Sequence, residues 1–331
     1  MAWDFVTNSM NSSLGRAQHM RDNALALYEQ GEYSFAIDRV DEFECTTDMT
    51  MARNVWGHFT APFYLNGTTR GSMLPRENGQ RVMQPQASAT KNNNFLIRIP
   101  CSLIKKATPA KMLVEYGHGL FGTRDELLDE QFDIMANNYD WIFYATDWYG
   151  MATFDVLAVL KVLINDMSDF PILPESVNQG WAARAIGLRM LLNEISTDDS
   201  LKVNGVRLLT PDTPRQFYGN SQGAVVGGGF ATYSRDFTRV ALMVPGSPFA
   251  FLLGRSSAFT FYSQFMRLQF YTWFDIRLGL SLIQSFWDPA ESAGWLNLLN
   301  RDVQPGFEPK QALLQGTILL SCTNSLYLHL I

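Results

Sequence analysis

Histidine and cysteine are scarce in this sequence, which has four histidines and three cysteines among 331 residues. Cys45, Cys101 and Cys322 lie far apart without the spacing of a metal site, and their odd number argues against a disulfide framework. We therefore expect three buried structural thiols and no metal. A nucleotide-binding fingerprint between a strand and a helix is also lacking, so we expect no cofactor.

Basic residues are outnumbered, with 26 Lys and Arg against 32 Asp and Glu, so the net charge is −6 and nucleic acid is not an expected partner. The N-terminus lacks the basic segment and apolar run of a signal peptide. The apolar stretch from Leu313 is interrupted by polar residues, so the sequence carries no strong membrane signal. The sequence does not determine the cellular compartment, and a secreted parent protein is one of the options. The glycosylation sequons at Asn11 and Asn66 would matter only in a secreted protein.

Apolar residues are abundant, at 47% of the chain, so the sequence can build one large α/β domain or two average ones. From residue 95 onward, apolar strand-like runs alternate with helical patterns. One of these patterns covers residues 123–138, with Thr123 as N-cap and Glu126 as its capping-box partner. The repeated β-α-β units predict an α/β fold, with a mostly parallel sheet and helices on both faces.

A serine lies inside the stretch Gly219-Asn220-Ser221-Gln222-Gly223, between an apolar strand-like run and a helix rich in small residues. In a G-x-S-x-G turn the glycines remove Cβ clashes, and the serine occupies the tip of a strained strand-to-helix connection. The start of the helix directs backbone N–H groups at the same point. Ser221 is therefore our candidate nucleophile, and the alternative is an ordinary glycine-rich turn.

A second motif, His118-Gly119-Leu120-Phe121-Gly122, also follows a strand and precedes a helix. Attack on an ester carbonyl builds negative charge on its oxygen, which two preorganised N–H groups must stabilise. We predict that the backbone N–H groups of Leu120 and Gln222 are these donors. His118 is interpreted as a residue that shapes the loop and not as the catalytic base.

With these two motifs in this order, residues 95–320 resemble the α/β-hydrolase superfamily of serine hydrolases, which includes esterases, lipases and thioesterases. The resemblance implies an α/β-hydrolase fold with a nucleophile elbow at Ser221, an oxyanion hole and a helical cap insertion. The aromatic-rich segment 249–300 would be that cap, ordinary helical core being the alternative. We expect an N-terminal helix, strands and exposed loop in 1–94, the hydrolase core in 95–248, the cap in 249–300, and a last core strand with an atypical tail in 301–331.

The catalytic acid and base that the resemblance implies are missing from their expected places. The superfamily orders its triad as Ser, then Asp or Glu, then His, but the only histidine after Ser221 is His329, close to the end of the chain. Asp288, Asp302 and Glu308 precede the last expected strand, so they would belong to the cap or its return loop. We interpret the sequence as an α/β-hydrolase with an incomplete C-terminus, explained equally by truncation, an alternative transcript or a gene-model error.

The sequence thus predicts a serine hydrolase that acts on a carboxylic ester or related acyl compound through an acyl-serine intermediate. Activity in this chain is expected to be impaired because the acid and base are missing. The alternative is a catalytically inactive α/β-hydrolase-like binding protein, which keeps the pocket without turnover. The aromatic-rich cap favours a small-molecule substrate with an apolar acyl or alcohol group. A structural protein would explain the turn at Ser221 but not the 118–122 motif.

Overall fold

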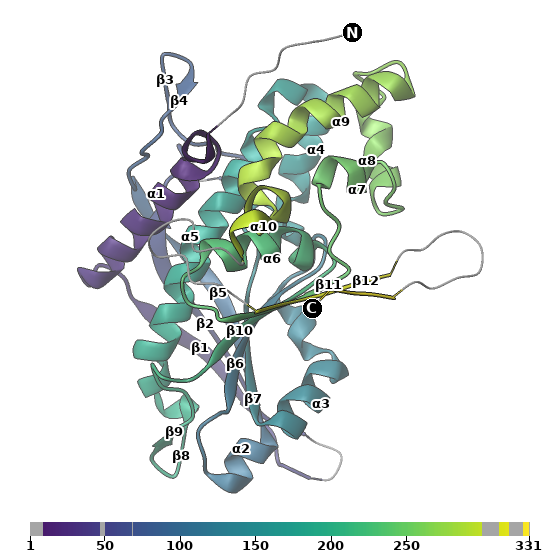
Figure 1. Cartoon of the computed structure of the whole chain (residues 1–331). Helices are drawn as coiled ribbons and strands as arrows, with labels where there is room; N and C mark the ends of the chain where they lie inside the picture. Colours follow the sequence, from purple (N-terminus) through teal and green to yellow (C-terminus); the bar gives the residue numbers. More distant parts are fainter. Residues whose placement is uncertain (1–8, 47–49, 68, 300–310, 318–326, 331) are drawn as a thin grey trace.

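A twisted, nine-stranded sheet runs through the part of the chain that the structure describes (Figure 1). This computed structural model describes residues 9–46, 50–67, 69–299, 311–317 and 327–330. The strands lie in the order β1-β2-β5-β7-β6-β10-β11-β12-β13. Their bounds are β1 Phe35–Glu42, β2 Met51–Phe63, β5 Ala89–Pro100, β6 Met112–Gly117, β7 Trp141–Thr146, β10 Arg215–Asn220, β11 Arg239–Met243, β12 Gln311–Thr317 and β13 Tyr327–Leu330. Two small hairpins pair β3 (Arg76–Glu77) with β4 (Gln80–Arg81) and β8 (Lys202–Val203) with β9 (Val206–Arg207).

Parallel pairing joins the strands in the middle of this sheet. Strands β7, β6, β10, β11 and β12 pair in parallel, whereas β1, β2 and β5 pair antiparallel at one edge. Strand β6 is buried along its whole length and is apolar apart from Glu115, as expected of a strand that is covered on both faces. The predicted α/β fold is confirmed, with its parallel part where the sequence alternates between strand and helix.

Helices cover both faces of the sheet. Alternate side chains of β6 enter two separate hydrophobic clusters: Leu113 packs in the larger cluster with α1, α5, α6 and α10, and Val114 packs in the smaller one with α3. The helices are α1 Met10–Glu29, α2 Cys101–Lys106, α3 Glu130–Tyr139, α4 Val156–Asn165, α5 Ile172–Asn193, α6 Gln222–Tyr233, α7 Phe249–Leu253, α8 Phe259–Met266, α9 Trp273–Trp287 and α10 Ser292–Leu299. The 3₁₀ helices are η1 Arg124–Leu128, η2 Thr153–Asp155, η3 Met167–Asp169, η4 Ile195–Thr197, η5 Asp199–Leu201 and η6 Asp288–Ala290.

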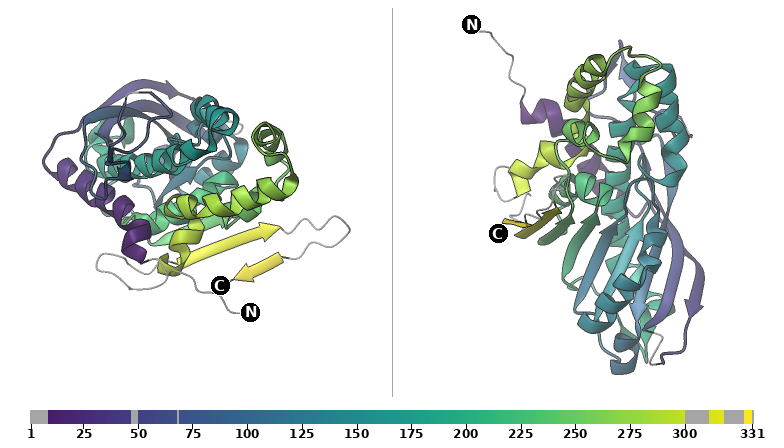
Figure 2. Two further views of the ribbon diagram at one scale, coloured as in Figure 1. Left: turned by 90° about the horizontal axis from the view of Figure 1, so that it is seen from above. Right: turned by 90° about the vertical axis from the view of Figure 1, so that its right-hand side faces the viewer.

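Helices α4, α7, α8 and α9 gather beyond the carboxyl ends of the parallel strands (Figures 1 and 2). Three of them come from the segment 249–300, and α4 comes from the connection between β7 and α5. The division of the chain into four segments stays a prediction. None of the described helices combines the length and apolar character needed to cross a bilayer.

The expectation of three free thiols is wrong for two of the cysteines, because Cys45 and Cys101 form a disulfide with Cα atoms 5.6 Å apart. The two residues are 56 positions apart in sequence, so spacing alone did not reveal the pair. They meet because β1 pairs with β2 and β2 pairs with β5, which brings the end of β1 close to the end of β5. Cys322 lies outside the described residues.

The predicted helix over residues 123–138 is divided in two. Thr123 caps the 3₁₀ helix η1, where its hydroxyl accepts a hydrogen bond from the N–H of Asp125 at 3.3 Å, and α3 begins only at Glu130. Glu126 does not close a capping box with Thr123. Its carboxylate instead binds the 118–122 loop, a tertiary contact that competes with the local one.

The predicted incomplete C-terminus lies largely outside the described residues. Strand β12 pairs in parallel with β11, and β13 pairs antiparallel with β12, with Gln315 opposite His329 in register. The structure leaves residues 300–310 and 318–326 undescribed, and Asp302 and Glu308 are among them.

Candidate active site

Ser221 lies at the turn between β10 and α6, in a backbone conformation that few residues other than glycine adopt. Its φ of 53° and ψ of −120° fall outside the regions that L-residues normally occupy. The turn is held on both sides: the N–H of Ser221 donates to the carbonyl oxygen of Met243 at 3.0 Å, and its carbonyl oxygen accepts from the N–H of Ala224 at 2.9 Å. A strained serine between a strand and a helix is the geometry of a nucleophile elbow.

The two glycines of the motif are required by close backbone approaches. A Cβ atom added to Gly219 would lie 2.2 Å from the carbonyl oxygen of Gly223, and one added to Gly223 would lie 1.9 Å from the carbonyl oxygen of Gly117. Side chains at these positions would overlap backbone atoms. Gly219 therefore lets the helix fold back over the strand, and Gly223 lets the elbow contact the end of β6.

The 118–122 loop lies directly against the elbow. A Cβ atom added to Gly119 would be 4.0 Å from the Cβ of Ser221. Leu120 and Gln222, the predicted donors, line the same cavity as Ser221. Within the described residues, the backbone N–H groups of Leu120 and Gln222 donate to no protein acceptor, so both are free for a ligand oxygen.

Glu126 holds the 118–122 loop in place. Its two carboxylate oxygens accept from the N–H of Gly119 at 3.1 and 3.0 Å, and one of them also accepts from the Tyr116 hydroxyl at 2.8 Å. The amide of Gly119 is therefore occupied, and the amide of Leu120 is the next one along the loop. Sequence reasoning missed this role because Glu126 also satisfies the local capping-box pattern.

His118 uses both ring nitrogens to shape the loop. Nδ1 lies 2.9 Å from the carbonyl oxygen of Gly119, and Nε2 accepts from the N–H of Trp148 at 2.8 Å, so Nδ1 is the protonated nitrogen. Burial lowers the pKa of His118 to about 4. A neutral histidine with both nitrogens bonded to backbone groups is not available as the base for Ser221. The geometry agrees with the loop-shaping interpretation.

We expect His118 to make the fold sensitive to acid. Between pH 6.5 and about pH 4, the unfolded chain binds a proton on this ring and the folded chain does not, so stability is lost as the pH falls through that window. The loss attributable to His118 is on the order of 3 kcal/mol. Urea unfolding of the wild type and of His118→Gln, repeated from pH 7 to pH 4, measures this loss. The free energy of unfolding should fall more steeply with decreasing pH in the wild type than in the variant. Equal pH dependence in the two proteins would contradict the assignment.

A buried ion pair lies beneath the same loop. Arg184 of α5 bonds Glu115 of β6 with 2.8 Å between Nε and Oε1, and both side chains are buried. The guanidinium also donates to the carbonyl oxygens of Thr146 at 2.9 Å and Tyr116 at 2.8 Å. It therefore joins the ends of β6 and β7, from which the active-site loops depart. Sequence analysis had no signal for this pair, whose members lie 69 positions apart.

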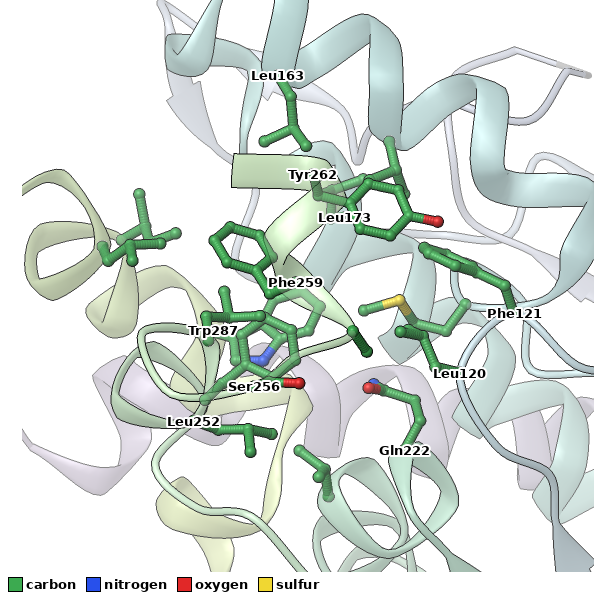
Figure 3. Close-up of a pocket in the computed structure, with 18 of the residues that line it drawn as sticks. Leu120, Phe121, Leu163, Leu173, Gln222, Leu252, Ser256, Phe259, Tyr262 and Trp287 are labelled. Atoms are coloured by element: carbon green, nitrogen blue, oxygen red, sulfur yellow. The ribbon is translucent and has the colours of Figure 1, made fainter. Parts of the chain in front are cut away.

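Ser221 borders an apolar cavity. Figure 3 shows this cavity in close-up. Its volume is about 150 Å³, and a cavity of about this size holds a benzene-sized group. The polar groups that border it belong to Ser221, Gln222 and Ser256, together with the Tyr262 hydroxyl and the Trp287 indole N–H. The side chain of Gln222 points into the cavity, and its buried Nε2 has no partner among the described residues (Figure 3). The aliphatic and aromatic wall residues include Leu120, Phe121, Val159, Leu163, Leu173, Val225, Phe249, Leu252, Phe259, Tyr262, Met266, Leu280, Ile283 and Trp287.

The wall of this cavity draws on more of the chain than the segment 249–300. Helices α7, α8 and α9 contribute from that segment, and α4 contributes Val159 and Leu163 from the connection after β7. The sequence did not indicate this use of α4, because its apolar pattern is equally typical of a helix packed on the sheet.

No base or acid for Ser221 is found among the described side chains, since none of the residues that line its cavity is a histidine or a carboxylate. Asp288 accepts from the Gln284 amide at 2.6 Å and does not line the cavity. His329 is described only through its backbone in β13. Nor do three His, Cys, Asp or Glu side chains of the described residues cluster as a metal site requires.

The strand order and the elbow define the class of protein. A parallel sheet flanked by helices, antiparallel strands at one edge, and a strained serine at the end of the β10 strand before helix α6 make up the α/β-hydrolase fold. The chain has this fold.

Three of the solved structures to which this chain is similar are esterases. Acetyl xylan esterase 1 from Thermoanaerobacterium sp. JW/SL YS485 is 12% identical, with a TM-score of 0.46 over 83% of this chain and 73% of that chain. An acetyl xylan esterase from Paenibacillus sp. R4 is 14% identical, with a TM-score of 0.41 over 94% and 89%. A CE15 glucuronoyl esterase from Teredinibacter turnerae T7901 is 12% identical, with a TM-score of 0.35 over 90% and 67%. No protein-family model and no curated protein matches the chain. All three TM-scores lie below 0.5, so the fold assignment rests on the topology and on Ser221.

Proposed function

We propose that this protein carries an acyl-transfer site for a small carboxylic ester with an apolar acyl group, with Ser221 as the nucleophile. The observation that carries the proposal is the strained elbow at Ser221, which faces an apolar cavity beside two free backbone amides. A glycine would adopt this backbone conformation without strain, whereas a serine adopts it at a cost in conformational energy. A structural role alone would therefore favour glycine at this solvent-accessible position.

The arrangement supports the first half of an ester hydrolysis. The Oγ of Ser221 attacks the ester carbonyl, and the oxygen that becomes negative accepts from the N–H groups of Leu120 and Gln222. The N-terminus of α6 adds a favourable dipole at the same point. The acyl group occupies the apolar cavity, and loss of the alcohol leaves an acyl-serine that water hydrolyses.

A proton acceptor for the Ser221 hydroxyl is the missing component. A complete serine hydrolase transfers this proton to a histidine that a carboxylate orients. The described residues at the cavity supply neither, so we propose that turnover by this chain is impaired. The same observation favours a second function, a binding protein that holds an acyl compound in the cavity without cleaving it.

Covalent capture tests the proposal. We expect incubation with p-nitrophenyl hexanoate to release p-nitrophenolate slowly and to leave a hexanoyl group on Ser221, detected by intact-protein and peptide mass spectrometry. Ser221→Ala should form no adduct, whereas Ser256→Ala, which removes the other serine of the cavity, should still form it.

The outcomes separate the two functions. An adduct that Ser221→Ala abolishes supports the acyl-transfer site. Binding of hexanoate to the wild type without any adduct supports the binding protein. Acylation at equal rates in wild type and Ser221→Ala would contradict a nucleophilic Ser221.

A further inference from the structure

Helix α9 is apolar on two opposite faces. Ile276, Leu280 and Trp287 point inward and are buried. Phe274, Leu278, Leu282 and Phe286 follow one another at intervals of four residues, so they form a stripe along one side of the helix, and all four are exposed. The core covers only one of these two apolar faces, so the other is left in contact with solvent.

The exposed apolar surface continues into the turn between α8 and α9. Tyr271 is 94% exposed and Phe274 is 73% exposed, and Leu268 and Trp273 beside them are exposed as well. Exposed apolar patches of this extent mark interaction sites. Tyrosine and tryptophan are the side chains that favour the boundary between water and lipid, because one end is apolar and the other hydrogen-bonds.

The segment 251–286, which carries the stripe, has a net positive charge, although the whole chain has a net charge of −6. The segment 251–286 contains three arginines, Arg255, Arg267 and Arg277, and a single acidic residue, Asp275. All three arginines are exposed, and none forms an ion pair within the described part of the chain. Asp275 is occupied as the capping partner of Thr272, whose hydroxyl donates to it at 2.7 Å. This segment, with three arginines and one aspartate, therefore complements negative charge, while the exposed Asp166 and Asp169 lie on the neighbouring connection, where the Met167 N–H donates to the Gln269 side chain at 3.3 Å.

The stripe and the cavity share the same helices. Phe259 and Tyr262 of α8 and Ile283 of α9 line the cavity beside Ser221, and Phe261 between the first two is exposed. The exposed side of α8 and α9 therefore lies next to the wall of the cavity. A lipid molecule that reaches these helices from outside would be close to the cavity.

We propose that the exposed face of α8 and α9 docks on the surface of an anionic lipid aggregate, on which it lies without spanning it. The apolar stripe enters the boundary between head groups and acyl chains, and the arginines contact phosphates. This inference rests on the proposed function, because it names the source of the ester substrate. The ester would be presented by the lipid surface to which the protein binds.

Vesicle flotation with the Ser221→Ala protein tests docking without turnover, so docking and catalysis can fail separately. We expect co-flotation with vesicles of phosphatidylcholine and phosphatidylglycerol, and much weaker flotation with phosphatidylcholine alone. Replacing Arg267 or Arg277 with glutamine should weaken binding by about fivefold each, and high salt should remove that difference.

The apolar stripe is tested by the triple variant Phe274→Ser, Leu278→Ser, Leu282→Ser, for which we expect binding at least about tenfold weaker. The matched control is Ile134→Ser with Tyr139→Ser, two exposed apolar residues on α3, far from the cap helices in Figure 1. Circular dichroism checks that each variant is folded.

Three results would overturn the proposal. The first is an equal reduction of vesicle binding by the triple variant and by the α3 control. Another is equal binding to neutral and anionic vesicles. The third is a dimer without lipid, measured by sedimentation, that the triple variant converts to a monomer, because the stripe would then be covered by a second copy of the chain.

Discussion

Replacing Gly223 with alanine is expected to destabilise the fold by about 3 kcal/mol or more, at the upper end of the usual range for overpacking. The new Cβ would lie 1.9 Å from the carbonyl oxygen of Gly117 and 2.8 Å from that of His118. Both are backbone atoms, so no rotamer change can relieve the overlap. The elbow and the 118–122 loop must separate, and the site that they form together is lost.

Urea unfolding, followed by circular dichroism, measures the loss from Gly223→Ala. Gly254→Ala is the matched control, because Gly254 has a φ of −63° and an added Cβ would lie 3.9 Å from the carbonyl oxygen of Phe251. The control should change the unfolding free energy by no more than about 0.5 kcal/mol. A Gly223→Ala protein as stable as the control would show that the elbow and the loop are not in contact.

Replacing Arg184 with methionine is expected to destabilise the protein by about 3–5 kcal/mol. The change removes the ion-pair partner of Glu115 and the two hydrogen bonds to the ends of β6 and β7, and it leaves the Glu115 carboxyl group in the interior without that partner. Arg39→Met is the control, because the Arg39 side chain is 61% exposed in its ion pair with Asp41. A surface pair of this kind contributes less than about 1 kcal/mol.

The pH dependence identifies the uncompensated charge as the cause. Burial raises the pKa of Glu115 to about 7 although Arg184 opposes the rise, and without Arg184 it rises further. A raised carboxyl pKa contributes stability that is present below the unfolded value and is lost as the pH rises through the folded value. The destabilisation by Arg184→Met should therefore be greater at pH 8 than at pH 5, and Glu115→Gln in the same chain should recover part of it. Equal destabilisation at both pH values would point to lost packing instead.

The components of the site that lie close together in sequence were predictable. The turn at Ser221 depends on two glycines, an apolar strand before it and a helix of small residues after it, all within about fifteen positions. The 118–122 loop is similar, since its glycines signal a backbone that other groups approach closely. Local steric demands fix such elements, so the residues themselves carry the information.

Contacts between distant segments were predicted poorly. The sequence predicts free thiols at Cys45 and Cys101 and a helix-capping role for Glu126, whereas the structure has a disulfide and a contact between Glu126 and Gly119. In both cases the local pattern allowed an alternative that was equally good chemically. The pairing of β1, β2 and β5 decided the outcome for the two cysteines. For Glu126 it was decided by the fold of the 118–122 loop, which brings the Gly119 N–H to the carboxylate.

The sequence by itself determined the fold class, the elbow at Ser221 and the loop that carries Leu120, because each follows from short-range sterics and from the alternation of apolar runs. Only the tertiary structure decided that α4 joins α8 and α9 around the cavity, that Arg184 and Glu115 support the strand ends, and that α9 leaves an apolar stripe exposed. The physical reason is that burial belongs to the packed molecule: an apolar side chain has the same transfer free energy wherever it stands in the sequence, and neighbours that can lie a hundred residues away decide which side chains leave water.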